Sequence, residues 1–189
     1  GDELLARLET ELIEAEKNLV SAGDKLSSSR SRAARSFSDA VCENLSFMDM
    51  NGVKFTVDIK ESKYSKTGRD SVEFFISANA GESLKPLNKV ASGGELSRIM
   101  LAIKSIIADK DNVDTLIFDE IDTGISGRAA SKVAVQLQKV SSLRQVICVT
   151  HLAQIAAAST GHFLIEKSVR DGKTYTNVTR LVDDERINE

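Results

Sequence analysis

The stretch Ala91-Ser92-Gly93-Gly94-Glu95-Leu96-Ser97-Arg98 joins a glycine pair to the start of a helical pattern. Ser92 is a favourable N-cap, and Glu95 three residues later completes a capping box. Gly93 and Gly94 have no side chains, so an anion could approach their N–H groups closely. The stretch therefore predicts a capped helix start, and it is also the pattern of a phosphate site at a helix N-terminus. Apolar residues follow at a spacing that predicts one buried helix face: Leu96, Ile99, Met100, Ile103, Ile106 and Ile107.

Two short apolar runs further along the chain end in polar residues. Residues 115–118 lead to Asp119 and Glu120, and residues 145–149 lead to Thr150-His151. Helical patterns alternate with these runs, which predicts parallel strands whose C-terminal ends share one edge of a sheet. A strand that simply ends in polar residues is the alternative.

These polar residues have a chemistry in common if they meet at that edge. Asp119 can hold a hydrated Mg²⁺, since carboxylate oxygen suits this hard ion. Glu120 can orient and deprotonate a water molecule, and His151 can donate a hydrogen bond to a phosphate or to the attacking water. The group predicts a site for phosphate chemistry.

Two turns, at residues 122–127 and 172–174, have sequences similar to functional motifs. Residues 122–127, beginning with Asp122, form a glycine-rich turn into a helix for which Ser126 is the expected cap, and an ordinary turn explains them almost as well. Gly172-Lys173-Thr174 is similar to the end of a P-loop, but Lys167 stands where the pattern requires glycine, and a strand follows instead of a helix. We therefore find no P-loop in this chain.

Composition limits the function classes. The 189 residues suffice for one domain with a proper core. Acidic residues outnumber basic ones 28 to 25, so binding of nucleic acid through bulk charge is not indicated. Cys42 and Cys148 lie far apart without disulfide or metal spacing, which fits a reducing cytoplasm. No apolar run approaches the ~20 residues of a membrane span, and a start at Gly1 instead of Met suggests a piece of a longer protein.

The N-terminal part has the pattern of a coiled coil, which we expect over residues 1–29. A single amphipathic helix packed on its own domain is the alternative. A cluster of Arg30, Arg32 and Arg35 follows, either as solvated surface or as a DNA contact, and residues 30–189 are expected to form the globular part. The heptad positions step by three and four residues: Leu5, Leu8, Leu12, Ala15, Leu19, Ala22 and Leu26.

The remaining segments predict antiparallel strands. Residues 53–59 and 72–78 alternate in polarity as a strand pair, joined by a polar loop that holds Lys60, Lys63, Lys66 and Arg69. Pro86 is expected in a loop. Residues 162–169 and 173–181 predict a hairpin with a turn at Asp171-Gly172.

Taken in order, four motifs resemble the head of an ABC-type ATPase. Ser92-Gly93-Gly94-Glu95 resembles the signature motif, Phe118-Asp119-Glu120 resembles Walker B, Asp122 resembles the D-loop, and His151 resembles the switch histidine. Transport ATPases usually carry glutamine where Glu95 stands, so glutamate together with a coiled coil points to the SMC-like branch. Within that branch, three stretches closely resemble the RecN family of bacterial DNA repair proteins, namely residues 91–98, 119–127 and 150–156.

The resemblance implies an α/β fold, the C-terminal lobe of an ABC-type ATPase head. It would contain a mostly parallel sheet with flanking helices, additional antiparallel strands and an N-terminal coiled-coil helix. ATP and Mg²⁺ are the implied ligands. Asp119 would position the metal, and Glu120 and His151 would act in catalysis. Asp122 would line the contact between two heads, and the signature residues Ser92, Gly93, Gly94 and Glu95 would bind the nucleotide held by the other head.

Walker A and the Q-loop are missing from this chain. The resemblance places them in the N-terminal half of the same head, which is therefore an implied partner. It also implies an ATP-bridged homodimer, DNA as macromolecular partner, no membrane, and a cytoplasmic, nucleoid-associated protein. The full-length protein would hydrolyse ATP in double-strand-break repair and recombination, whereas this chain alone would be inactive. The alternatives are a head fragment of another SMC-like chromosome-structuring ATPase and a non-enzymatic coiled-coil interaction module.

Overall fold

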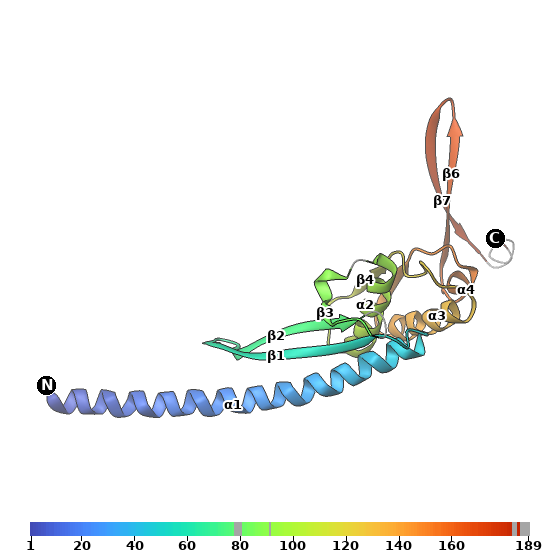
Figure 1. Cartoon of the computed structure of the whole chain (residues 1–189). Coiled ribbons are helices and arrows are strands. Elements are labelled where there is room, and N and C mark those ends of the chain that lie inside the picture. Colours follow the sequence, from blue (N-terminus) through green and yellow to red (C-terminus); the bar gives the residue numbers. More distant parts are fainter. Residues whose placement is uncertain (78–80, 91, 183–184, 186–189) are drawn as a thin grey trace. The chain divides into compact units, whose positions relative to one another are not determined.

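The computed structural model describes residues 1–77, 81–90, 92–182 and 185 (Figure 1). Residue 78, the last of the predicted strand 72–78, and Ala91, the first of the stretch 91–98, lie outside the described residues. The chain divides into two compact units. The first comprises residues 1–43 and 52–89, and the second comprises residues 44–51 and 90–189.

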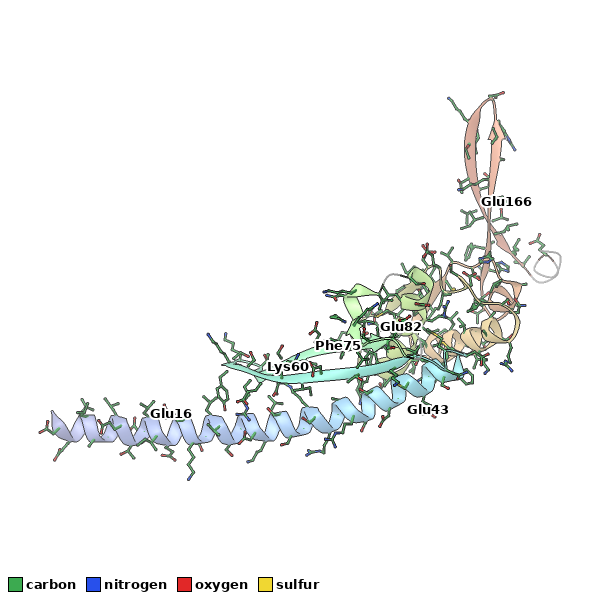
Figure 2. The ribbon with its side chains drawn as sticks, in the orientation of Figure 1. Glu16, Glu43, Lys60, Phe75, Glu82 and Glu166 are labelled. Atoms are coloured by element: carbon green, nitrogen blue, oxygen red, sulfur yellow. The ribbon has the colours of Figure 1, made fainter. Side chains whose placement is uncertain are left out.

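Helix α1 (Asp2–Phe47) runs without interruption through the arginine cluster, so the predicted division at residue 29/30 falls within one helix. In its first half the side chains project into solvent, Glu16 among them (Figure 2). The heptad leucines there are exposed, with Leu12 at 59% and Leu19 at 49%. The coiled-coil pattern is thus carried by a helix whose seam is exposed over residues 5–22.

Strands β1 (Lys54–Ser65) and β2 (Gly68–Ser77) form the predicted antiparallel pair, with Val57 opposite Phe74 and Ile59 opposite Val72. The prediction of a polar loop between them is wrong, because both strands continue to a two-residue turn at 66–67. Contacts with α1 support this extension: Ser27 Oγ and Arg30 Nη1 donate to the carboxylate of Asp70 at 2.6 and 2.7 Å.

An aromatic cluster fixes the base of this hairpin on α1. Phe37 of the helix meets Phe55 of β1 and Phe74 of β2, with ring centroids 5.6 to 6.0 Å apart. Strand β3 (Lys85–Pro86) then pairs with β2, and the 3-10 helix η1 (Leu87–Lys89) follows. The loop predicted at Pro86 is therefore an edge strand, a position that tolerates proline because one side of an edge needs no N–H donor.

The second unit contains helix α2 (Gly93–Ile107), strand β4 (Thr115–Phe118), helix α3 (Gly127–Ser141), strand β5 (Gln145–Cys148) and helix α4 (Ala153–Ala157). Strands β4 and β5 are parallel, as predicted, with Phe118 opposite Cys148. The core side chains are nearly inaccessible, at 1% exposure or less: Ile99, Leu101, Ile121, Val133 and Val140. These strands therefore deliver their C-terminal ends to one edge.

The end of α1 belongs to this second unit and is held by α3. Gln136 Nε2 donates to Asn44 Oδ1 at 2.6 Å, and Lys132 Nζ donates to Asp49 Oδ1 at 2.8 Å. Asp49 has a positive φ of 63° just after the helix ends. These polar contacts accompany a buried apolar side chain, Leu45, at 0% exposure.

Strands β6 (His162–Arg170) and β7 (Lys173–Leu181) form the predicted hairpin. Asp171 and Gly172 have φ values of 51° and 72°, as a type I′ turn requires at its two central residues. None of the described helices combines the length and apolar character that crossing a lipid bilayer would require.

Candidate nucleotide site

The N-terminus of α2 has the predicted cap. Ser92 is in an extended conformation, with φ −93° and ψ 120°, and its Oγ accepts a hydrogen bond from the Glu95 N–H at 3.4 Å. Ser92, which is exposed, and Glu95, which is half-buried, thus lie at the start of a 15-residue helix. Such a terminus carries the positive end of the helix dipole.

Gly94 is required for close packing between this helix and the loop after β4. A Cβ atom at Gly94 would lie 2.9 Å from Thr123 Cβ and 3.0 Å from the carbonyl oxygen of Glu120. The first contact is shorter than real Cβ atoms show and the second is tighter than most of them, so a side chain would push α2 away from the loop. The glycine thereby joins two motifs that lie more than twenty residues apart in the sequence.

Gly93 faces the carboxylate of Glu120. A Cβ atom at Gly93 would collide with Glu120 Oε2, so the carboxylate occupies the space that the missing side chain leaves. A negative group is favoured there by the positive end of α2. The structure therefore brings together Gly93 and Glu120, two residues that the sequence assigned to separate motifs.

Glu120 has a positive φ of 57°, which is unusual for a residue other than glycine. Its N–H donates to Asp119 Oδ1 at 2.9 Å, so the two acids form a tight turn directly after β4. Both side chains are exposed. Strained backbone at a residue that also carries an exposed acid is common at functional sites.

Residues that the sequence analysis did not single out hold this acid loop in place. Arg98 is only 6% exposed, and its Nη1 donates to the carbonyl oxygens of Ile121 and Thr123 at 3.0 and 2.9 Å. Ser97 Oγ donates to the carbonyl oxygen of Asp119 at 2.8 Å. Burial lowers the pKa of the Arg98 guanidinium, although the nearby Glu95 and Asp122 charges oppose this effect. No sequence signal marked this role, because Arg98 lies off the apolar face that the spacing predicts for the helix.

The second strand end is tied to the same loop through Asp122, which is 3% exposed. Its Oδ2 accepts hydrogen bonds from Thr150 Oγ1 at 2.5 Å and from the His151 N–H at 2.8 Å, and it lies 3.0 Å from His151 Nδ1. Burial opposes ionisation of this carboxyl, yet the hydrogen bonds and the histidine together hold its pKa below the ordinary value. Thr150, like Arg98 and Ser97, is a residue to which the sequence analysis gave no role.

Mg²⁺ binding can be tested against the groups present. Among the described residues no three His, Cys, Asp or Glu side chains gather as a metal cage. Burial and the charges of Asp122 and Asp119 raise the pKa of the Cys148 thiol to about 11, and sulfur is in any case a poor ligand for the hard Mg²⁺ ion. Mg²⁺ at nucleotide sites typically takes one or two carboxylates together with substrate phosphates. The exposed carboxylate of Asp119 fits that requirement.

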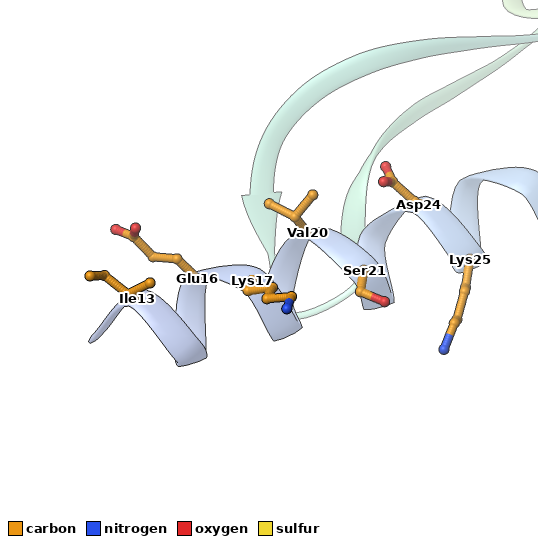
Figure 3. Close-up of a pocket in the computed structure, with 7 residues that line it drawn as sticks. All are labelled: Ile13, Glu16, Lys17, Val20, Ser21, Asp24 and Lys25. Carbon is orange, nitrogen blue, oxygen red and sulfur yellow. The ribbon is translucent and has the colours of Figure 1, made fainter. Parts of the chain in front are cut away.

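A shallow hollow elsewhere on the chain has no such chemistry. Its lining residues all belong to α1, as Figure 3 shows, and they include Ile13, Lys17 and Val20. One face of a single helix cannot enclose a small molecule. The hollow is a surface feature of the unpartnered half of α1.

Comparison with known proteins gives a consistent result. No protein-family model matches the chain. The DNA repair protein RecN of Bacillus subtilis is 39% identical over 204 residues, which cover 100% of this chain and 35% of RecN. RecN of Treponema pallidum is 43% identical over 178 residues, which cover 90% of this chain and 31% of that protein. The chain spans about a third of the length of the curated relatives it matches.

Solved structures agree on the fold. The SMC head domain with a coiled coil and joint from Pyrococcus yayanosii matches 96% of this chain and 33% of its own, with a TM-score of 0.64 and 21% identity. A structure from a study of ATP-driven dimerisation and DNA-stimulated activation of SMC ATPases matches 86% of this chain and 93% of its own, with a TM-score of 0.51 and 22% identity. The chain is therefore similar over 90–100% of its length to about a third of the RecN DNA repair proteins, and it has the fold of an SMC head domain.

Proposed function

We propose that the chain is the C-terminal half of a RecN-like ATPase head, which dimerises with ATP and hydrolyses it in DNA double-strand-break repair. One observation carries the proposal: the glycine terminus of α2 packs directly on the acid loop, with the Glu120 carboxylate against Gly93. A phosphate-binding helix end and an acid suited to activating water are thus held in one lobe. Neither feature is needed for a module that only provides a coiled coil.

Each site residue has a distinct role in this proposal. Asp119 would hold Mg²⁺, which when bound neutralises phosphate charge. Glu120 would take a proton from the attacking water, and its exposed carboxylate is free to turn toward solvent. His151, 74% exposed at its side chain, would contact the γ-phosphate or the water.

The remaining part of the head is proposed to cover surfaces that this chain leaves open. Ile117 of β4 is 69% exposed and Ile147 of β5 is 46% exposed on the parallel strand pair. Parallel strands are normally covered on both faces. A second lobe that brings Walker A to this pair would complete both the sheet and the nucleotide site.

Two such heads would share two nucleotides. The α2 terminus of one head, with Ser92, Gly93, Gly94 and Glu95, would meet the γ-phosphate bound by the other. Asp122 would lie near that contact. Because each head supplies part of both sites, ATP would hold a two-fold dimer together and hydrolysis would release it. DNA is the proposed macromolecular partner because the relatives are DNA repair proteins.

The test uses the full-length protein with two substitutions of opposite effect. Glu120→Gln should retain ATP binding but lose about 10²–10⁴ in turnover, since the amide cannot take a proton. It should accumulate as an ATP-bound dimer. Ser92→Arg places bulk and charge at the α2 terminus, so each head should bind ATP but fail to dimerise. Light scattering with ATP and Mg²⁺ separates these outcomes.

Matched controls are available in the same lobe. Glu166→Gln changes an exposed acid on β6. Ser141→Arg adds the same bulk and charge as Ser92→Arg, but at the C-terminal end of a different helix, α3. Both should behave as wild type. If Glu120→Gln stays monomeric with ATP, or if Ser92→Arg dimerises and hydrolyses normally, the proposed shared site is wrong. Separately, the 189-residue chain should show no micromolar ATP affinity in calorimetry.

A further inference from the structure

Asp122 carries a cluster of hydrogen bonds that the proposed ATPase mechanism does not use. Its carboxylate is 4% exposed, whereas the ring that it contacts, His151, is 74% exposed. One oxygen, Oδ2, accepts hydrogen bonds from the Thr150 hydroxyl at 2.5 Å and from the His151 N–H at 2.8 Å, and His151 Nδ1 lies 3.0 Å from the same oxygen. A buried acid thus accepts a hydrogen bond from the backbone of an exposed histidine and lies next to one nitrogen of its ring.

The chemistry of this contact decides where the imidazole proton lies. An ionised carboxylate only accepts hydrogen bonds. The pKa of Asp122 is lowered, because the hydrogen bonds from Thr150 and His151 and the histidine charge outweigh its burial, so the carboxylate is ionised at neutral pH. His151 Nδ1 must therefore carry hydrogen whether the ring is neutral or protonated. The hydrogen bond made by one ring nitrogen sets the state of the other.

We propose that Asp122 is the positioning residue for His151. Its carboxylate accepts Nδ1–H and so fixes the orientation of the ring, which leaves Nε2 as the atom that contacts the nucleotide or the water. This inference rests on the proposed ATPase function only for the identity of the nucleotide. Neutral His151 then offers Nε2 as an acceptor for water, and protonated His151 offers it as a donor to phosphate. Thr150 supports the arrangement by donating to Asp122 while accepting from the Leu152 N–H at 3.0 Å.

The first test reads the ring directly in the 189-residue chain. The chain contains two histidines, so His162→Gln assigns the signals. Long-range proton–nitrogen correlation in alkaline buffer should show His151 with hydrogen on Nδ1. Asp122→Asn should shift the ring toward the Nε2–H form, since the amide can donate to Nδ1. An unchanged His162 signal shows that the lobe is still folded.

The matched control is Asp119→Asn, which makes the same chemical change on an exposed residue of the same loop. It should leave the His151 tautomer unchanged. An equal shift in Asp119→Asn would mean that charge in general, and not the contact with Asp122, sets the tautomer, and would overturn the proposal. Finding wild-type His151 in the Nε2–H form would overturn it even if Asp122→Asn failed to fold.

The second test measures turnover in the full-length protein. Asp122→Asn should lower kcat about 10- to 100-fold, the usual loss when the partner that orients a functional histidine is removed, with little change in the KM for ATP. In a His151→Ala background the same substitution should cause no further loss. A further loss there would show that Asp122 acts by itself and would overturn the positioning role. A full-length protein without ATPase activity would count against the proposed function and leave the tautomer result standing.

Discussion

The two ends of helix α1 carry the same apolar stripe but differ in what covers it. At 3.6 residues per turn, Leu12 and Leu19 point to the same side of the helix as Gly23, Arg30 and Val41. Leu12 and Leu19 are 59% and 49% exposed, whereas Val41 is 0% exposed. The change occurs at Gly23, where a Cβ atom would lie 2.9 Å from the Tyr64 ring of the β1–β2 hairpin.

From Gly23 onward, the β1–β2 hairpin covers the face of α1 that a partner helix would cover over residues 1–22. Beyond Gly23 it presents Tyr64, Arg69 and Asp70 to the helix, and Arg69 Nη2 donates to Asp24 Oδ1 at 2.6 Å. A helix pairing with α1 would have to end near residue 22, because the tip of the hairpin occupies the face from there on. A strict heptad pattern therefore identifies a face to be buried, but not its partner.

The strongest test of this difference is a matched pair of leucine substitutions. Leu45→Ala removes a side chain with 0% exposure and should lower the free energy of unfolding by about 2–5 kcal/mol. Leu12→Ala removes one that is 59% exposed and should change it by no more than about 0.5 kcal/mol. Urea denaturation followed by circular dichroism measures both. Similar losses for the two variants would mean that the first half of α1 is packed after all.

Sequence patterns predicted the helices and strands whose apolar spacing can be recognised within the segment itself. Helix α2, its Ser92 cap and the parallel pair β4–β5 agree with the prediction because apolar spacing determines each of them. The outer parts of β1 and β2 were missed, since their residues are polar on both faces and are ordered by contacts with α1 such as Asp70 with Arg30. Alternation in polarity cannot report such a tertiary contact.

The candidate site shows the same limit. Ser92, Gly93, Glu120 and His151 could be named from motifs, but their mutual arrangement depends on groups that touch across the fold. Arg98 reaches carbonyl oxygens 23 and 25 residues away, and Thr150 reaches an acid 28 residues away. Carbonyl acceptors leave no signature in a sequence, so an arginine that serves them cannot be distinguished from a surface arginine before the fold is known.

A smaller effect should come from shortening α1 at two places. A chain that begins at Gly23 keeps every described contact between the hairpin and the helix, so its thermal unfolding should match that of the full chain. It should also lose the concentration-dependent self-association that an unpaired apolar stripe favours. A chain that begins at Arg30 loses Asp24 and Ser27 as partners of the hairpin and should unfold at a lower temperature. Sedimentation velocity measures self-association, and calorimetry measures thermal unfolding. If self-association persists without residues 1–22, the apolar seam is not the surface that causes it.

The smallest expected effect concerns the pH dependence of the covered end of α1. Hydrogen bonds from Ser27 and Arg30 lower the pKa of the Asp70 carboxyl, although burial acts in the opposite direction. A lowered pKa in the folded state stabilises the protein above the unfolded-state value of about 3.9. That contribution is lost as the pH falls through the still lower folded-state pKa. Asp70→Asn removes it, so the difference in melting temperature between wild type and variant should be full at pH 7 and shrink below about pH 4.

Asp39→Asn makes the same change at an exposed position of α1 and should show little difference at any pH. Equal melting temperatures for wild type and Asp70→Asn at pH 7 would mean that the contacts of Asp70 with Ser27 and Arg30 add nothing measurable to the stability of the hairpin on α1.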